Sequence, residues 1–254
     1  LQAMSPSPAG LPNKASVMYY WPGRVVRKIA TKFAAATRSR RWGGMNTPAK
    51  DMPAGQFLLF NCVVIFGHVL VLLNTGAYLP MIPEVGAAFG VNALYANWAQ
   101  TDFFVGLALS GPLSVWLVSH RGEARVFFEV FAGFAAAAAV CALTQHFAVF
   151  LVARFFMGFA GGLSIPLSLN VLIRHYRPNR RALGLAVWGA TVLTPFTVAP
   201  LIGGWITDEL GWRWLFITDV AGALATGVYG LLLLQGRDRE AVATPLDLVG
   251  LLLL

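Results

Sequence analysis

Apolar and polar positions follow one another along this chain in long blocks. Six apolar runs, separated by short polar segments, cover residues 57–82, 97–119, 125–144, 147–173, 181–206 and 213–235. A helix of about 20 apolar residues is long enough to cross a hydrocarbon core about 30 Å thick. Gly and Pro inside several runs fit this interpretation, because neighbouring helices satisfy the backbone groups that they free. The pattern therefore predicts an all-α integral membrane protein with six transmembrane helices.

Composition supports the same class of protein. The 254 residues are 57% hydrophobic and 12% charged, with a mean hydropathy of +0.65, whereas soluble domains carry about 25% charged residues. An ordinary soluble enzyme and a disordered chain are both excluded on this ground. Cys62 and Cys141 lie inside apolar runs, so we interpret them as small buried hydrophobic residues.

The basic residues predict the orientation in the membrane. Seventeen of the 19 Lys and Arg lie before the first run or in the segments after the second, fourth and sixth runs. These segments share one side if all six runs cross, and basic residues mark the cytoplasmic side. Arg213 lies on the other side and Arg154 lies inside a run. We therefore expect six spans with a cytoplasmic N-terminus, and the net charge of +8 does not indicate nucleic-acid binding.

The two ends of the chain differ from its middle. We expect residues 1–44 to be an upstream or disordered extension, the alternative being a basic amphipathic arm on the membrane surface. Residues 45–56 would be the cytoplasmic N-terminus, 57–235 the six-helix bundle and 236–245 a cytoplasmic linker. Residues 246–254 would begin a seventh helix, since Pro245 and Asp247 suit a helix N-terminus.

Several motifs, in order and spacing, resemble the Major Facilitator Superfamily, and most closely its fourteen-helix drug:proton antiporter branch. An Asp and a Pro of the first helix are matched by Asn74 and Pro83, and a Trp and a Thr of the second by Trp98 and Thr101. The fourth helix carries Arg154 followed by Gly158, Gly161, Gly162 and Pro166. A Trp-Arg-Trp segment follows at residues 212–214. The likeness extends from about residue 72 to residue 254.

Two further motifs of the family occur in altered form. The cytoplasmic loop motif after the second helix keeps Arg121, Gly122 and Arg125, but Ser119 stands where the family has Asp. The antiporter motif of the fifth helix keeps Pro200, Gly203 and Gly204, but Ala199 replaces its first Gly. The loop motif acts in the family as a cytoplasmic latch, and the antiporter motif abuts the other half of the transporter.

The resemblance implies a fold and a function. The fold would be two three-helix repeats of inverted topology, the N-terminal half of a transporter. The function would be export of hydrophobic or cationic drugs in exchange for protons, in a bacterial cytoplasmic membrane. The partners would be a small-molecule substrate, protons, the lipid bilayer and an envelope-spanning adaptor protein. The helix 4 Arg, here Arg154, takes part in proton coupling in the family, but the helix 1 carboxylate is here Asn74, which cannot titrate.

Charged residues inside a membrane are costly and usually functional. Arg154, Asp102, Asp219 and Asn74 fall at comparable depths in the outer half of the predicted bundle. Arg154 needs a partner, and Asp102 is our candidate, either as the proton-coupling acid or in a static ion pair. For Asp219 we favour a position near the lipid headgroups, in contact with water.

Other residues admit two interpretations each. His68 shares a seven-residue spacing and one helix face with Asn61 and Thr75. That polar stripe suits a water-filled cavity, and an imidazole titrates near physiological pH, so His68 is a candidate for contact with protons or substrate. The alternative is a hydrogen bond between helices, which a lone membrane His more commonly makes. The glycines of the fourth helix either permit close helix packing or leave room for substrate, and we favour packing.

The chain carries no catalytic signature, no metal-ligand spacing and no phosphate-binding loop, so we expect neither an enzyme nor a cofactor or metal. Two alternatives stay open. One is a transporter of the same superfamily for another solute with altered proton coupling, which Asn74 and Ser119 favour. The other is a membrane scaffold that does not transport, which Arg154 and Asp102 argue against.

Overall fold

The computed structural model describes residues 53–176 and 178–235. Within these ranges every regular element is a helix. The elements are α2 (Ala54–Ala77), η3 (Leu79–Met81), α3 (Ile82–Phe89), α4 (Ala93–Arg121), α5 (Glu123–Leu143), α6 (Phe147–His175), η4 (Pro178–Arg180), α7 (Arg181–Leu210) and α8 (Arg213–Leu234). The predicted segments 1–44, 236–245 and 246–254 lie outside the described residues.

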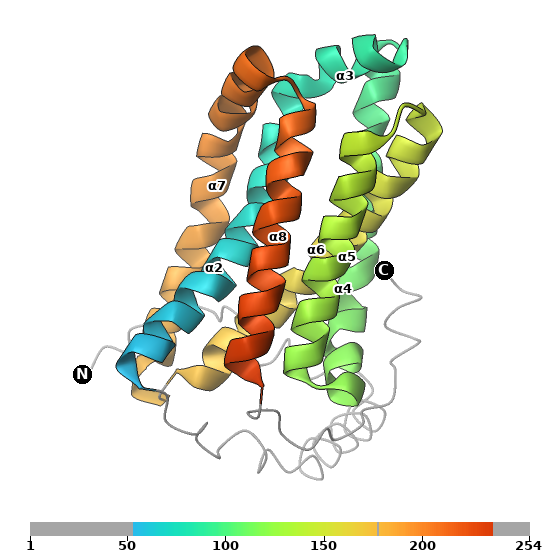
Figure 1. Cartoon of the computed structure of the whole chain (residues 1–254). Coiled ribbons are helices and arrows are strands. Elements are labelled where there is room, and N and C mark those ends of the chain that lie inside the picture. Colours follow the sequence, from blue (N-terminus) through green and yellow to red (C-terminus); the bar gives the residue numbers. More distant parts are fainter. Residues whose placement is uncertain (1–52, 177, 236–254) are drawn as a thin grey trace, which may run out of the picture. The chain divides into compact units, whose positions relative to one another are not determined.

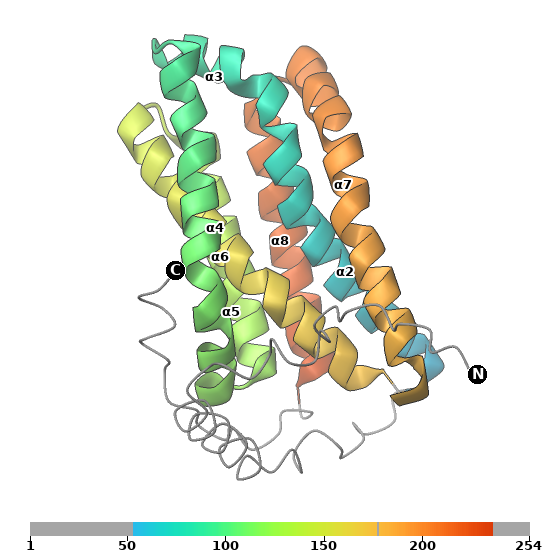
Figure 2. The same cartoon turned by 180° about the vertical axis from the view of Figure 1, so that it is seen from behind.

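The long helices α2, α4, α5, α6, α7 and α8 correspond to the six apolar runs and lie side by side (Figures 1 and 2). The first run differs most from the prediction, because its helix ends before the run does. It breaks at Tyr78, where Pro80 falls in the short helix η3, and continues as α3 at one end of the bundle. We call this end the α3 end, and the other the basic end.

Within the described ranges, four segments are long and apolar enough to cross a membrane: Gly55–Phe89, Glu123–Leu143, Phe147–His175 and Arg213–Leu234. A fifth is α7, if its two parts, bent by 43° between Leu193 and Thr197, count as one span. Pro195 lies inside this bend, and a Pro inside a helix removes a backbone hydrogen bond. The remaining long helix, α4, carries Asn97, Gln100, Thr101 and Asp102 in its first half, which lowers its hydropathy.

The packing of the helices repeats itself. α6 packs on α4 and α5, α2 packs on α7 and α8, and α5 packs on α8. Exchanging α2 with α6, α4 with α7 and α5 with α8 leaves this set of pairs unchanged. The apolar core lies where these helices meet and contains aromatic side chains such as Phe103, Phe131, Phe134, Phe150 and Phe216.

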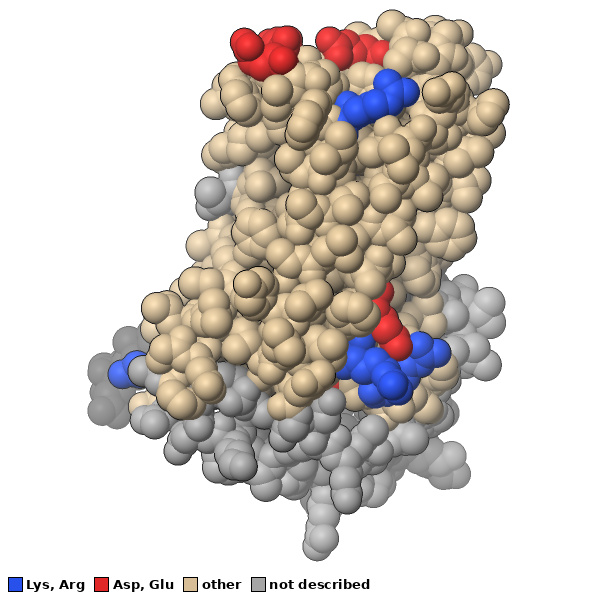
Figure 3. All heavy atoms as spheres, in the orientation of Figure 1, with Lys and Arg blue, Asp and Glu red and all other residues tan. Residues whose placement is uncertain are grey.

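The described charged residues gather at the two ends of the bundle. Figure 3 shows one face, on which the band between the ends carries no visible charge. The acidic residues Glu84, Asp208 and Glu209 belong to the loops and helix ends of the α3 end, whereas the basic end carries most of the described Arg residues. Among the described residues, Asp102, Arg154 and Asp219 lie along the helices between these ends, and Glu129 lies inside α5, where it pairs with Arg121.

Candidate functional site

Arg154 lies inside α6 with no exposed surface. Its Nη1 donates to Asn74 Oδ1 at 2.7 Å and its Nη2 to Gln100 Oε1 at 2.8 Å, while Nε donates to the Ala99 carbonyl oxygen at 3.4 Å. A guanidinium is permanently charged and can only donate. The neighbouring helices therefore supply the acceptors that make its burial possible.

Aromatic rings surround the same guanidinium. Its Cζ lies 4.3 Å from the ring centroid of Tyr78, 4.7 Å from that of Phe103 and 5.6 Å from that of Phe216. The negative face of an aromatic ring attracts a cation, and more strongly where water is excluded. Tyr78 is itself fixed, because its hydroxyl donates to the Ala96 carbonyl oxygen at 3.0 Å.

Asn74 joins Arg154 to a carboxylate. Its Nδ2 donates to Asp219 Oδ2 in α8 at 2.6 Å, while its Oδ1 accepts from Arg154. Among the described residues no direct ion pair joins Arg154 to Asp219, so the neutral amide separates the two charges. We call Asn74, Gln100, Arg154 and Asp219 the Arg154 cluster.

Gln100 completes the cluster from α4. Its Nε2 donates to the Thr75 carbonyl oxygen at 2.9 Å, so its Oε1 is directed at Arg154. The sequence analysis missed this residue. It lies on the same α4 face as the buried Ala96, Ala99 and Phe103, and a polar residue on an apolar face would have indicated it.

The structure corrects two predictions about carboxylates. Asp219 does not lie among headgroups in contact with water, because it is 2% exposed and hydrogen-bonded to Asn74. Asp102 is half-buried, and among the described contacts it forms no ion pair with Arg154. Asn74, Arg154 and Asp219, which the sequence placed at comparable depths, therefore do meet. The side chain of Asp102 projects from α4 in a different direction from that of Gln100.

His68 is buried at the junction of α2, α6 and α7. Its Nδ1 lies 3.4 Å from Ser168 Oγ, and its ring centroid lies 5.0 Å from that of Trp188. Ser168 Oγ also accepts from Trp188 Nε1 at 3.3 Å. Together with Asn61 and Thr75, His68 was predicted to form a polar stripe, and all three are buried. His68 thus connects helices, while its Nε2 has no hydrogen-bond partner among the described residues.

The glycines of α6 allow helices to approach closely. A Cβ at Gly158 would overlap the backbone of Phe103, and one at Gly162 would overlap the backbone of Leu107 in α4. A Cβ at Gly161 would lie 2.8 Å from Val71 Cγ1 in α2. The packing interpretation is therefore confirmed for these positions. Pro166 lies inside the same helix and is half-buried.

The residues of the antiporter motif face two different sides of α7. A Cβ at Gly203 would overlap the Ala77 backbone, so this glycine serves the packing of α7 on α2. A Cβ at Gly204 would meet nothing within 4 Å, and Pro200 is exposed. Tight packing at Gly203 is thus internal to the described helices.

Two ion pairs between described residues lie at the basic end. Arg121 Nη1 lies 2.9 Å from Glu129 Oε2. Arg174, at the end of α6, pairs with Glu123 at the start of α5, and the sequence analysis missed this pair. Gly122 between α4 and α5 has φ +84°, which favours glycine. Ser119 donates to the Trp116 carbonyl oxygen at 2.7 Å, and Arg125 is exposed.

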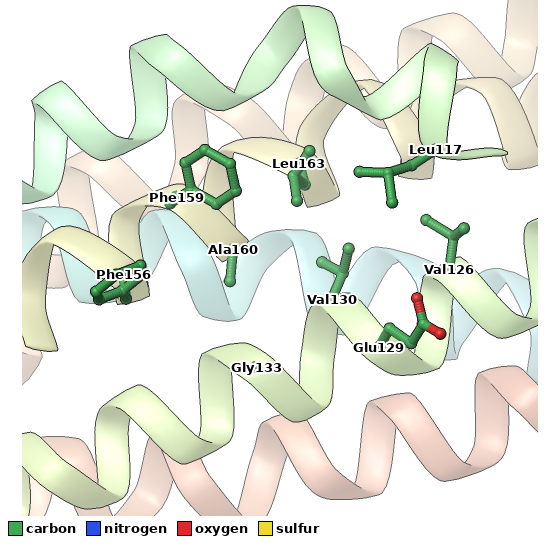
Figure 4. A pocket seen from close by; sticks show the side chains of 9 residues that line it. All are labelled: Leu117, Val126, Glu129, Val130, Gly133, Phe156, Phe159, Ala160 and Leu163. Carbon is green, nitrogen blue, oxygen red and sulfur yellow. The ribbon is translucent and has the colours of Figure 1, made fainter. Parts of the chain in front are cut away.

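A pocket opens between α4, α5 and α6 (Figure 4). Glu129 is its one charged lining residue, and the others are Leu117, Val126, Val130, Gly133, Phe156, Phe159, Ala160 and Leu163. None of these residues belongs to the Arg154 cluster. No group of three or more His, Cys, Asp or Glu side chains in the described ranges could hold a metal ion.

Comparison with known proteins identifies the fold family. The sequence model of the Major Facilitator Superfamily matches residues 64–248. The chain is similar to the multidrug export protein EmrB of Haemophilus influenzae, with 29% identity over 83% of this chain and 42% of the relative. It is also similar to the fatty acid resistance protein FarB of Neisseria gonorrhoeae, with 32% identity over 72% of this chain and 36% of the relative.

Solved structures agree on the fold. A peptide transporter POT in complex with sulfate aligns with a TM-score of 0.62 and 18% identity, over 78% of this chain and 42% of that one. The proton:xylose symporter XylE aligns with a TM-score of 0.60 and 14% identity, over 72% and 45%. The chain thus spans about two fifths of the length of the relatives that it matches.

Proposed function

The chain belongs to the Major Facilitator Superfamily, and we propose that it is the N-terminal part of a proton-coupled exporter of hydrophobic or cationic drugs. The general class, a membrane transporter of small molecules, follows from the family. The names of the relatives support drug export, since EmrB is a multidrug export protein and FarB a fatty acid resistance protein.

The observation that carries the proposal is the burial of Arg154 together with a carboxylate. Arg154 is fully buried and Asp219 is 2% exposed, inside helices that the family places in a membrane. Ionisable groups at that depth cost several kcal/mol, about 2.5–3.5 on insertion scales, and mark ion or proton pathways. A packing role alone would be filled at lower cost by apolar side chains.

The Arg154 cluster also supplies a means of coupling. Its members come from α2, α4, α6 and α8, so a change in its charge alters the contacts among four helices. Protonation would bias a two-state equilibrium of the transporter halves, and substrate would bind the deprotonated state. A ligand or proton shifts such an equilibrium by its difference in affinity for the two states.

The packing symmetry of the fold supports two inverted three-helix repeats, which are a common plan of secondary transporters. The basic end would face the cytoplasm, in the cytoplasmic membrane of a bacterium, as the bacterial relatives suggest. An envelope-spanning adaptor protein is proposed as a partner of the whole transporter.

A second candidate function is transport of another solute with altered proton coupling. Asn74 favours it, because an amide at this position cannot take up a proton, and Ser119 leaves the loop motif without the Asp that the family has there.

The test uses the full-length protein in inverted membrane vesicles with an imposed proton gradient and a pH-sensitive dye. We expect added drugs to collapse the gradient with the wild type and not with Arg154→Gln. The matched control is Arg180→Gln, which changes an exposed arginine outside the family motifs. Absence of any collapse with the wild type, over a panel of hydrophobic and cationic compounds, would instead favour the transporter of another solute.

A further inference from the structure

We propose that Asp219 of α8 carries the transported proton, and that Asn74 of α2 is a neutral bridge linking its charge to Arg154. This inference rests on the proposed function and assigns the proton to one residue. The sequence analysis offered Asp102 as the proton-coupling acid or as a static ion-pair partner of Arg154, and it favoured a position near the headgroups for Asp219. The assignment to Asp219 therefore comes from the structure.

The direction of each hydrogen bond is fixed by the chemistry of Arg154. A guanidinium only donates, so the amide oxygen of Asn74, 2.7 Å away, accepts from it. The amide nitrogen then has to donate, and it donates to Asp219 Oδ2 at 2.6 Å. Reversing the amide would place N–H against N–H and leave Oδ2 facing an amide oxygen. Among the described residues, Asn74 is therefore the group that is hydrogen-bonded to both charges.

The neighbours of Asp219 include no second acid within the described ranges. The other members of the cluster are Asn74 of α2, Gln100 of α4 and Arg154 of α6. Beside them lie Tyr78, just after the end of α2, and Cys141 of α5. Asp208 and Glu209 of α7 are exposed at the α3 end, and Asp102 is half-buried on α4. One carboxylate and one guanidinium thus set the charge of the cluster.

Protonation changes that charge from zero to plus one. With Asp219 ionised, its charge balances that of Arg154 across the Asn74 amide. With Asp219 protonated, the guanidinium is left in a site that has no exposed surface and no counter-ion, which is unfavourable. The protonated cluster therefore favours an arrangement in which water or the rest of the protein solvates Arg154.

The step is a proton transfer without oxidation or reduction. Water on one side of the membrane delivers a proton, and an O–H bond forms at Asp219 Oδ1, the oxygen not engaged by Asn74. Oδ2 keeps the amide hydrogen bond as a carbonyl oxygen. After the conformational change the same O–H bond breaks, and the proton passes to water on the other side.

The experiment measures two reactions of the full-length protein in vesicles. One is drug-induced collapse of a proton gradient, and the other is exchange of labelled for unlabelled drug without a gradient. We expect Asp219→Asn to abolish the first and keep the second, because binding survives while the proton site is lost. The control Asp102→Asn, a second carboxylate at similar depth, should keep both.

The exchanged pair of residues provides the sharper test. The double variant Asn74→Asp, Asp219→Asn returns a carboxylate to the cluster, one position closer to Arg154, and should regain gradient collapse. The assignment would be overturned if the Asp219→Asn variant still exchanged protons for drug at the wild-type rate. It would also be overturned if the double variant folded and exchanged drug but moved no protons.

Two further outcomes keep the two proposals apart. Should Asp219→Asn not fold, as judged by its elution and melting temperature in detergent, Asp219→Glu replaces it. A shifted pH profile of antiport then supports the assignment, and an unchanged profile overturns it. Absence of gradient collapse with the wild type contradicts the proposed function itself, and with it the role of Asp219.

Discussion

Ala199 of α7 lies against Gly76 of α2, so closely that a Cβ on Gly76 would come within 2.7 Å of the Ala199 Cβ. Both residues are buried. The resembled antiporter motif has Gly at the position of Ala199, and here the missing space is provided by a glycine on the opposite helix. The α2–α7 contact thus stays tight although the motif has changed.

Gly76→Ala should therefore destabilise the protein. Overpacking a close contact costs about 1–3 kcal/mol of stability. Adding Ala199→Gly should restore most of the lost stability, because the double variant exchanges the positions of the alanine methyl group and the glycine. Melting temperatures in detergent check this. Gly204→Ala is the control, since a Cβ there meets nothing within 4 Å. Equal losses at positions 76 and 204 would contradict the proposed contact.

Gln100→Leu should destabilise the Arg154 cluster. Nη2 of Arg154 would lose its acceptor, and a buried donor without a partner costs about 1–3 kcal/mol, more when it is charged. Thr101→Val, on the exposed side of the same helix, should change little. Thermal unfolding of both variants in detergent measures the difference in stability. If Gln100→Leu lost no more stability than Thr101→Val, Gln100 would not be a partner of Arg154.

The two ion pairs of the basic end should differ in strength. The side chains of Arg121 and Glu129 are 56% and 37% exposed, and exposed pairs contribute about 0.2–1 kcal/mol. The Glu123 side chain is only 9% exposed beside Arg174, so its pair is less screened by salt. A double-mutant cycle at each pair, repeated at high salt, should give the larger and less salt-dependent coupling for Glu123–Arg174.

Ser168→Ala should cost more stability than Ser164→Ala. The Ser168 hydroxyl donates to the Ile165 carbonyl oxygen, so its oxygen is the acceptor for Trp188 Nε1. Removing the Ser168 hydroxyl leaves that indole N–H without an acceptor, which costs about 1–3 kcal/mol of stability. Ser164 Oγ donates only within its own helix, to Gly161. Equal melting temperatures for the two variants would show that the Trp188 contact is not stabilising.

Most helix bounds could be predicted from the sequence, whereas the contacts of individual residues came mainly from the structure. Hydropathy and length located all six long helices to within a few residues at most ends, because a membrane helix has to be apolar over a fixed length. The break at Tyr78, inside the first run, was missed, since Pro80 and Pro83 lie within an otherwise apolar segment and hydropathy does not register a change of direction. The close-packing role of Gly158 and Gly162 was predicted, because small residues four apart share a helix face.

The sequence by itself determined the class of protein, the order and approximate lengths of its helices, and the comparable level along the bundle at which Asn74, Arg154 and Asp219 lie. Depth follows from position along a helix and needs no knowledge of the neighbours. Only the tertiary structure decided which of these residues meet. The rotation of each helix about its axis placed Asp219 and Gln100 in the Arg154 cluster and directed Asp102 elsewhere. That rotation is set by packing between helices far apart in the chain, and no local pattern of residues contains it.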